Sequence, residues 1–208
     1  MSSRLTVLLV AALLPLAASA QAKSAASQFN FNDPGTRDTV SLTLDAPLEL
    51  IHGLSNSIKG SVTVEGTRAS GRFTVPVKSL TTGNPTRDGH LQNDRWLDAA
   101  KYPEIIFEFK DVVLPAALEP NKPLKINTKG KFTIRGVTRE EPVEVTATLI
   151  KETAETKNRA AGDLLRLRAR FLIPLEAYGI KRTEALILKV AETAEVSVDA
   201  WGSASFKL

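Results

Sequence analysis

The sequence predicts an all-β protein with one domain of about eight antiparallel strands. Apolar residues alternate with polar ones over most of the chain, which is the pattern of strands with one buried face and one wet face. The connections are short and carry Gly, Pro, Asn or Asp, and no helical segment is long enough for a crossover between parallel strands. Such strands can form a closed barrel or a sandwich, and alternation alone does not separate the two.

The first twenty residues predict a secretory signal peptide. Arg4 precedes the apolar run Leu5 to Leu14, and Ala18-Ser19-Ala20 supplies the small residues that a signal peptidase requires. The apolar run is shorter than the ~20 residues that span a bilayer. We therefore expect cleavage within residues 1–20 to leave Gln21 as the first residue of an exported protein.

The rest of the chain predicts one exported domain. Residues 21–28 are small and polar, as in a flexible spacer, and residues 29–208 suffice for a single domain with a large core. The chain has no cysteine, so it can form no disulfide, thiolate ligand or lipid-modified Cys. Its 27 Lys and Arg are interleaved with 23 Asp and Glu, which argues against a nucleic-acid-binding stripe.

Eight segments show the alternation of strands, and their apolar residues are expected to face the interior. Aromatic residues make up only 6% of the chain, so few bulky side chains are available to fill a lumen. Composition alone leaves both a filled core and a ligand-holding lumen open. In chain order, the apolar positions that define the segments are Val40, Leu42, Leu44; Val62, Val64; Phe73, Val75, Val77; Ile105, Phe107, Phe109; Leu124, Ile126, Phe132, Ile134; Val143, Val145, Ala147, Leu149; Leu165, Leu167, Ala169, Phe171, Ile173, Leu175; and Ala194, Val196, Val198.

The connection between the third and fourth segments, residues 81–103, is long and carries its own motifs. Leu91, Trp96 and Leu97 suit a short helical lid over the end of a barrel, and Pro103 pushes the residue before it toward an extended conformation. In order, the motifs are Thr82-Gly83, Arg87-Asp88-Gly89-His90-Leu91, Trp96-Leu97-Asp98 and Tyr102-Pro103, followed by the strand with Ile105, Phe107 and Phe109.

This order of residues resembles the polyisoprenoid-binding YceI-like family. Gly130 to Thr138 and Pro174 to Ile180 extend the resemblance, which covers residues 28–201. It implies a lipocalin-like, up-and-down antiparallel β-barrel with a short helical lid connector. It also implies an elongated apolar cavity that holds an isoprenoid or another long-chain lipid.

The residues expected to contact such a ligand form two groups. A polar mouth is expected at Arg87, Asp88 and His90, although pairing or capping within the connector is the alternative role for these three side chains. The lumen residues are Val75, Val77, Trp96, Phe107, Phe109, Phe132, Ile134, Phe171 and Ile173.

The available residues argue against catalysis and metal binding. His90 and Asp88 could act as a base and its orienting partner, but there is no Cys and no G-x-S-x-G motif to supply a nucleophile. The only other histidine is His52, so no metal site and no cofactor are expected. We expect a non-enzymatic periplasmic carrier of a long apolar lipid. The alternatives are a periplasmic hydrolase or isomerase that uses Asp88 and His90, and a stress-related adaptor with a filled core.

Two rows of basic residues lie opposite the apolar faces of their strands. A solvated outer wall is their ordinary meaning, and transient docking onto an anionic membrane is the alternative. The expected partners are therefore a long-chain lipid or isoprenoid and an anionic membrane surface, without nucleic acid, and the oligomeric state is open between monomer and homodimer. The two rows are Lys125, Lys129, Lys131, Arg135 and Arg166, Arg168, Arg170.

Overall fold

The computed structural model describes residues 26–208, so the predicted signal peptide and most of the predicted spacer lie outside the described residues. Among the described residues, no helix has the length and apolar character needed to span a membrane. The strands are β1 (Ser27–Phe31), β2 (Thr39–Ala46), β3 (Glu49–Ser55), β4 (Lys59–Glu65), β5 (Arg68–Pro76), β6 (Glu104–Val113), β7 (Leu124–Ile134), β8 (Val137–Ile150), β9 (Leu164–Pro174) and β10 (Thr193–Ser203). The helices are α1 (Pro85–Gln92) and α2 (Ala154–Lys157), with short 3-10 helices at Val77–Ser79, Leu175–Tyr178 and Glu184–Leu186.

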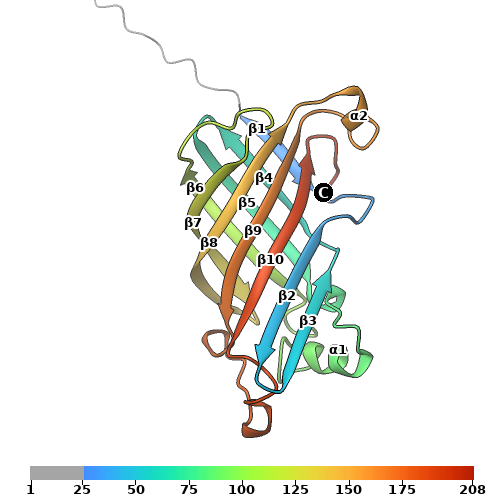
Figure 1. Cartoon of the computed structure of the whole chain (residues 1–208), viewed down its shortest axis with the longest axis vertical. Coiled ribbons are helices and arrows are strands. Elements are labelled where there is room, and N and C mark those ends of the chain that lie inside the picture. The colour runs from blue at the N-terminus through green and yellow to red at the C-terminus, as the bar shows by residue number, and fades with distance from the viewer. Residues whose placement is uncertain (1–25) are drawn as a thin grey trace, which may run out of the picture.

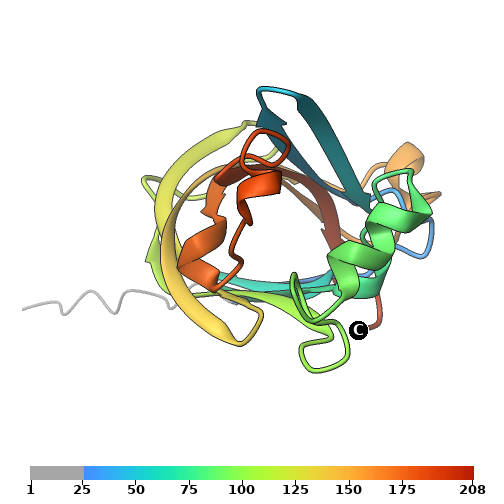
Figure 2. The ribbon, with the colours of Figure 1, turned by 90° about the horizontal axis from the view of Figure 1, so that it is seen from below.

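The ten strands form one antiparallel sheet that closes on itself. Its order is β1-β4-β5-β6-β7-β8-β9-β10-β2-β3, and β1 also pairs with β10, at Asn30 and Ser203. This pairing closes a barrel of β1 and β4 to β10, and the β2–β3 hairpin continues the wall from β10 (Figures 1 and 2). The predicted all-β, lipocalin-like barrel of about eight strands with a short helical lid connector is confirmed.

Two strands were not predicted from the alternation of the sequence. β1 includes Ser27 and Gln28, which the sequence placed in the spacer, and it pairs with β4 from its first residue. β3 buries Ile51, Gly53 and Ser55 on its inner face. Because two of these three inward residues are small and not strongly apolar, the hydrophobic pattern of β3 is weak. The tertiary structure rather than local patterning makes this segment a strand.

The interior contains two groups of buried apolar side chains, one at each end of the barrel. The group at the α1 end includes Val77 and Tyr178, and the group at the other end includes Phe31 and Leu165. Phe107 packs against both. A row of phenylalanine rings links the two ends, with centroids 5.0 Å apart for Phe31 and Phe73, 6.4 Å for Phe73 and Phe107, 4.5 Å for Phe107 and Phe132, and 4.6 Å for Phe132 and Phe171.

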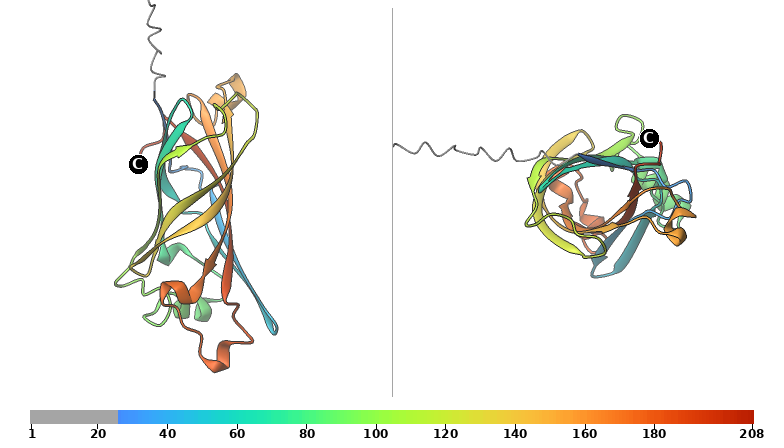
Figure 3. Two further views of the ribbon diagram at one scale, coloured as in Figure 1. Left: turned by 90° about the vertical axis from the view of Figure 1, so that its left-hand side faces the viewer. Right: turned by 90° about the horizontal axis from the view of Figure 1, so that it is seen from above.

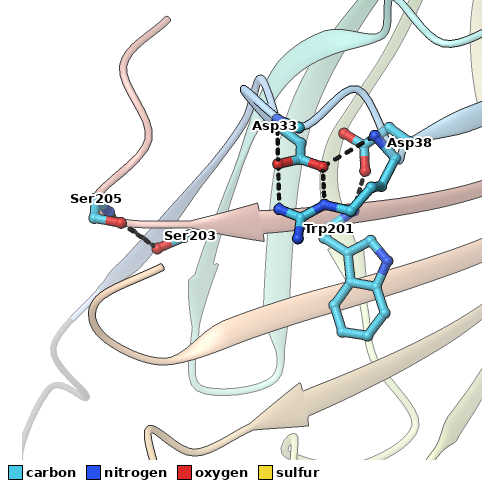
Figure 4. A network of polar contacts seen from close by, with 7 residues as sticks. Asp33, Asp38, Trp201, Ser203 and Ser205 are labelled. Atoms are coloured by element: carbon cyan, nitrogen blue, oxygen red, sulfur yellow. Dashed lines mark hydrogen bonds and ion pairs between the residues drawn. The ribbon is translucent and has the colours of Figure 1, made fainter. Parts of the chain in front are cut away.

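A buried carboxylate supports the closure of the barrel. β10 pairs with β2 as far as Asp199 and with β1 only at Ser203. Between these two residues, the N–H of Trp201 donates to Oδ1 of Asp38 at 2.8 Å (Figure 4). Asp38 is 1% exposed and its Oδ2 has no hydrogen-bond partner among the described residues. Burial raises the pKa of Asp38 to about 6. The carboxylate thus takes the place of a missing strand partner.

The neighbouring carboxylate of Asp33 has its pKa shifted in the opposite direction, to a lower value. Nε of Arg37 donates to its Oδ2 at 2.7 Å and Nη2 donates to its Oδ1 at 2.6 Å (Figure 4). This bidentate pair is the main cause that lowers the pKa of Asp33 to about 2. The β1–β2 connection therefore carries one stabilised and one destabilised carboxylate.

Candidate ligand-binding cavity

The lumen of the barrel contains a cavity of about 220 Å³. On β9 the lining residues are Leu165, Leu167, Ala169, Phe171 and Ile173, so the lining follows the period of two of a strand. These positions span ~26 Å of strand at about 3.3 Å per residue. Every lining residue except Thr128 is apolar. The shape and chemistry suit a long hydrocarbon chain.

The lower end of the cavity is covered by two segments that are distant in sequence. The connector after β5 contributes Leu80, Leu91, Trp96 and Leu97, and the segment after β9 contributes Leu175 and Ile180. Seen from below, both segments lie at the mouth of the barrel (Figure 2). The connector therefore forms the predicted lid, and the second segment shares this role.

Local sequence explains how the lid connector folds. The side chain of Asn84 caps α1 by accepting from the N–H groups of Thr86 at 3.1 Å and Arg87 at 3.2 Å, and Pro85 occupies the first turn, where no N–H is needed. Before the helix, Thr81 and Leu54 exchange two backbone hydrogen bonds, of 2.8 and 2.9 Å. These bonds attach the connector to the free edge of β3.

The turn between β7 and β8 adds a second attachment for the lid. Arg135 and Gly136 both have positive φ, 50° and 75°, as in a tight two-residue hairpin turn. The Arg135 side chain, which the sequence assigned to an exposed basic row, donates to the backbone carbonyl of Asp94 at 2.6 Å and also to that of Gly179. One guanidinium thus joins the two segments that cover the cavity.

Eight of the nine predicted lumen residues line the cavity: Val75, Trp96, Phe107, Phe109, Phe132, Ile134, Phe171 and Ile173. Val77 does not line it. After Pro76 the chain leaves β5 and turns into a 3-10 helix, so the period of two no longer applies at position 77. The Val77 side chain is 1% exposed and packs in the buried group at the lid end. Ligand contact by all nine residues stays a prediction.

The three predicted polar-mouth residues do not line the cavity. Nη1 of Arg87 donates to Oε1 of Glu49 on β3 at 2.9 Å. Asp88 accepts from the N–H and Oγ1 of Thr82, both at 2.7 Å, and from Oγ1 of Thr81 at 2.8 Å, and the Thr82 side chain is the main cause that lowers the pKa of Asp88. His90 is exposed. The contacts of Asp88 match the alternative role of capping within the connector, whereas Arg87 pairs outside the connector, with β3.

Sequence reasoning passed over several lining residues on the upper half of the barrel, among them Ala69 on β5, Val112 on β6, and Leu114 and Leu118 in the β6–β7 connection, and it did not count Thr128 on β7 among the lumen residues. Thr128 occupies the apolar face of its segment, between Ile126 and Phe132 in the alternation. That position was the available signal that the Thr128 side chain faces the interior. The two leucines lie in an irregular connection, where no period predicts direction.

The outer wall of the barrel mixes basic and acidic side chains. Arg166 donates to Asp199 through Nε at 2.8 Å and Nη2 at 2.6 Å, and Lys129 lies 3.7 Å from Glu140. The described residues contain no group of three or more His, Cys, Asp or Glu that could hold a metal ion.

Comparisons with known proteins agree with this architecture. A family model described as "YceI-like domain" matches residues 23–201. The chain is 20% identical to BcnA of Burkholderia cenocepacia, with a TM-score of 0.59 over 80% of this chain and 97% of that chain. It is 15% identical to a polyisoprenoid binding domain from Saccharophagus degradans, with a TM-score of 0.64 over 85% of this chain and 98% of that chain.

A third structure, the YCEI protein of Campylobacter jejuni, is 19% identical, with a TM-score of 0.59 over 75% of this chain and 85% of that chain. No curated protein matches the chain. At these identities the solved structures show a shared fold, whereas the family model covers most of the chain. The chain belongs to the YceI-like domain family.

Proposed function

We propose that this protein binds one long apolar lipid, of the polyisoprenoid or fatty-acyl type, in the barrel lumen and carries it in the periplasm. The composition of the cavity lining is the observation that carries this proposal, because Thr128 is its only polar member. Each buried methylene contributes ~0.8 kcal/mol. The hydrocarbon tail therefore supplies most of the binding free energy, even after the cost of ordering the chain.

Family membership and the similar structures support this ligand class. The Saccharophagus degradans structure with the same fold is that of a polyisoprenoid binding domain. The predicted signal peptide supports export to the periplasm. A carrier in the periplasm meets the membranes on both sides and can exchange lipid with each of them.

The contacts of Asp88 and His90 favour binding over hydrolysis or isomerisation. The Asp88 carboxylate accepts hydrogen bonds from Thr81 and Thr82. Neither Asp88 nor His90 lines the cavity. A reacting group buried in the lumen would therefore meet neither side chain. The cavity itself favours a lipid carrier over an adaptor with a filled core.

Native mass spectrometry of the protein purified from its own cells tests the proposal. We expect a fraction of the protein to carry one bound molecule, and lipid extraction should identify it as a long-chain or isoprenoid compound. Apoprotein alone, together with no uptake of any apolar chain from added lipids, would contradict the proposal and favour the adaptor.

A further inference from the structure

β6 and β7 are joined over only a short part of their length. They pair at Ile106 with Thr133, Phe107 with Phe132 and Glu108 with Lys131, and not beyond. β7 nevertheless pairs with β8 along its whole length, from Leu124 to Ile134. Toward the end of the barrel opposite the lid, β6 and β7 therefore diverge (Figure 3, left). We call this unpaired stretch the β6–β7 seam, formed by residues 109–113 and 124–130.

A bulge in β6 explains the divergence. Between the pairs Ala69 with Val112 and Gly71 with Phe109, one β5 residue, Ser70, lies opposite two residues of β6. One of them, Asp111, has a positive φ of 51°, and its N–H donates to Oγ of Ser70 at 2.9 Å. A bulge of this kind bends its strand and ends regular pairing. Here it holds β6 toward β5 and away from β7.

The seam lies against the apolar cavity. Phe109 and Val112 of β6, Ile126 and Thr128 of β7, and Leu114 and Leu118 of the following loop all line the cavity at this level. Successive N–H and C=O groups of a strand point to alternate sides. The facing edges of β6 and β7 therefore carry backbone donors and acceptors without ladder partners. The only polar lining side chain, Thr128, lies beside them.

The seam has defined borders. Its lower border is the pair of Glu108 and Lys131, where pairing stops. Its upper border is the 114–123 loop, which is held at both ends: Leu114 N–H donates to the Thr67 carbonyl at 2.8 Å, and Asn121 N–H donates to the Leu149 carbonyl at 2.7 Å. The seam is therefore a bounded gap in strand pairing rather than a frayed strand end.

The outer rim of the seam is rich in lysine. Lys110, Lys125 and Lys129 are exposed on its two edges. Lys129 has Glu140 at 3.7 Å, whereas Lys110 and Lys125 form no ion pair with a described residue. Asp111 is the acid within these two stretches and its side chain is exposed, and the exposed Glu144 of β8 lies opposite Asn127 of β7. The rim thus offers an excess of positive charge next to an apolar interior.

We propose that the β6–β7 seam is the mouth of the cavity and holds the anionic end group, a carboxylate or a phosphate, of the bound lipid. The inference rests on the proposed function and deepens it. Lys110 and Lys125 attract the end group from outside. The Thr128 hydroxyl, released from its 3.4 Å hydrogen bond to the Lys129 carbonyl, and backbone N–H groups of the two edges donate to it, and the tail fills the lumen below. The lid end is then the closed end of the cavity.

A matched pair of probes tests the end group. Dansylaminoundecanoate and its methyl ester differ only in the anionic end. Replacing Lys110→Gln and Lys125→Gln together is expected to weaken binding of the acid about ten-fold at low salt, because two exposed charges are lost, and to leave binding of the ester unchanged. Lys181→Gln with Lys189→Gln, at the lid end, is the matched control and should change neither. Competition by dodecanoate and by dodecyl phosphate then ranks the two anions.

Cross-linking tests the route of entry, because the natural chain contains no cysteine. Lys110→Cys with Lys129→Cys, joined by a short bis-maleimide, is expected to slow uptake and release of the probe by about ten-fold or more, as when an entry route is blocked. The control, Glu108→Cys with Lys131→Cys, bridges a position where the strands already pair and should leave both rates unchanged.

The outcomes separate this inference from the proposed function. If neither the acid nor the ester binds, the proposed function fails. If both bind equally, and neither the lysine variants nor the seam cross-link has an effect, the carrier stands and the seam proposal is overturned. A cross-link of Leu48→Cys with Leu188→Cys, whose backbones are hydrogen-bonded at the lid end, would in that case slow exchange and place the mouth there. Thr128→Val, which keeps the side-chain shape, tests the hydroxyl if the lysine variants fold poorly, because it should weaken binding of the acid and not of the ester.

Discussion

Phe107 on β6 lies directly over Gly130 on β7. A Cβ atom at position 130 would come within 1.9 Å of Cε2 of the Phe107 ring, so no side chain fits there without a shift. Phe107 also packs against Phe73, Phe109 and Phe132. The glycine therefore allows a large ring to lie across the short β6–β7 ladder, at the point where pairing ends.

Replacing this glycine should destabilise the barrel. We expect Gly130→Ala to lower the free energy of unfolding by about 1–3 kcal/mol, the usual cost of overpacking a core, as measured by urea denaturation. Gly89→Ala is the matched control, because position 89 lies in α1 with no atom within 4 Å of an added Cβ, and it should be neutral or slightly stabilising. If both variants lost the same free energy of unfolding, the close approach of Phe107 to position 130 would not be the cause of the destabilisation.

Narrowing the lumen should shorten the ligand. Val75 is 8% exposed and lines the cavity, so Val75→Phe is expected to yield a folded protein that retains a shorter lipid or none. Mass spectrometry of the co-purified lipid measures this, with Val137→Phe, outside the cavity lining, as control. Retention of the full native lipid by Val75→Phe would argue against a tail in the lumen.

Removing the Arg87 guanidinium should affect the lid more than the ligand. Its ion pair with Glu49 is partly exposed, 31% and 40% for the two side chains, so Arg87→Ala should cost less than about 1 kcal/mol of stability. The same lipid should remain bound and be released at the wild-type rate, because the lid end is the closed end of the cavity, as measured by release of dansylaminoundecanoate. Arg95→Ala, on the same connector, is the control. Complete loss of lipid in Arg87→Ala alone would place recognition at the predicted polar mouth.

Asp38 should make stability depend on pH between about 4 and 6. Its pKa is about 6 in the folded protein and near 3.8 when unperturbed, so the folded state binds the proton more tightly. This contribution is fully present below the unfolded pKa and is lost as pH rises through the folded pKa. Asp38→Asn should therefore raise the free energy of unfolding at pH 8 by about 2 kcal/mol and much less at pH 4.5.

Urea denaturation at the two pH values measures this effect. Asp33 provides the contrast, because its folded pKa of about 2 means that its contribution is present above the unfolded pKa and is lost only as pH falls toward 2. Asp33→Asn should therefore destabilise the protein at both pH 4.5 and pH 8. A wild-type and an Asp38→Asn protein with parallel pH profiles would show that the buried carboxylate is not titrating as stated.

Export can be checked independently of the fold. N-terminal sequencing of protein recovered from the periplasm should begin at Gln21, after the small residues Ala18-Ser19-Ala20. Exported material that began at Met1 would overturn the predicted cleavage.

Much of the barrel could be predicted because strand faces are a local property. In β9, Phe171 and Ile173 line the cavity, while Arg170 and Leu172, on either side of Phe171, point to the outer face and are exposed, as the period of two requires. The same rule placed Phe132, Ile134, Phe107 and Phe109 correctly in the wall of the cavity. It failed at Val77, where the strand ends one residue earlier.

The sequence by itself thus determined the strand faces, the apolar character of the interior and the position of the lid connector. The tertiary structure alone decided how the barrel closes, because Asn30 and Ser203 meet across almost the whole chain. It also decided that Arg87 turns to Glu49 rather than to a ligand, and that the bulge at Asp111 separates β6 from β7. These features depend on register between distant segments, and local periodicity carries no information about which residues a strand edge or a long polar side chain will meet.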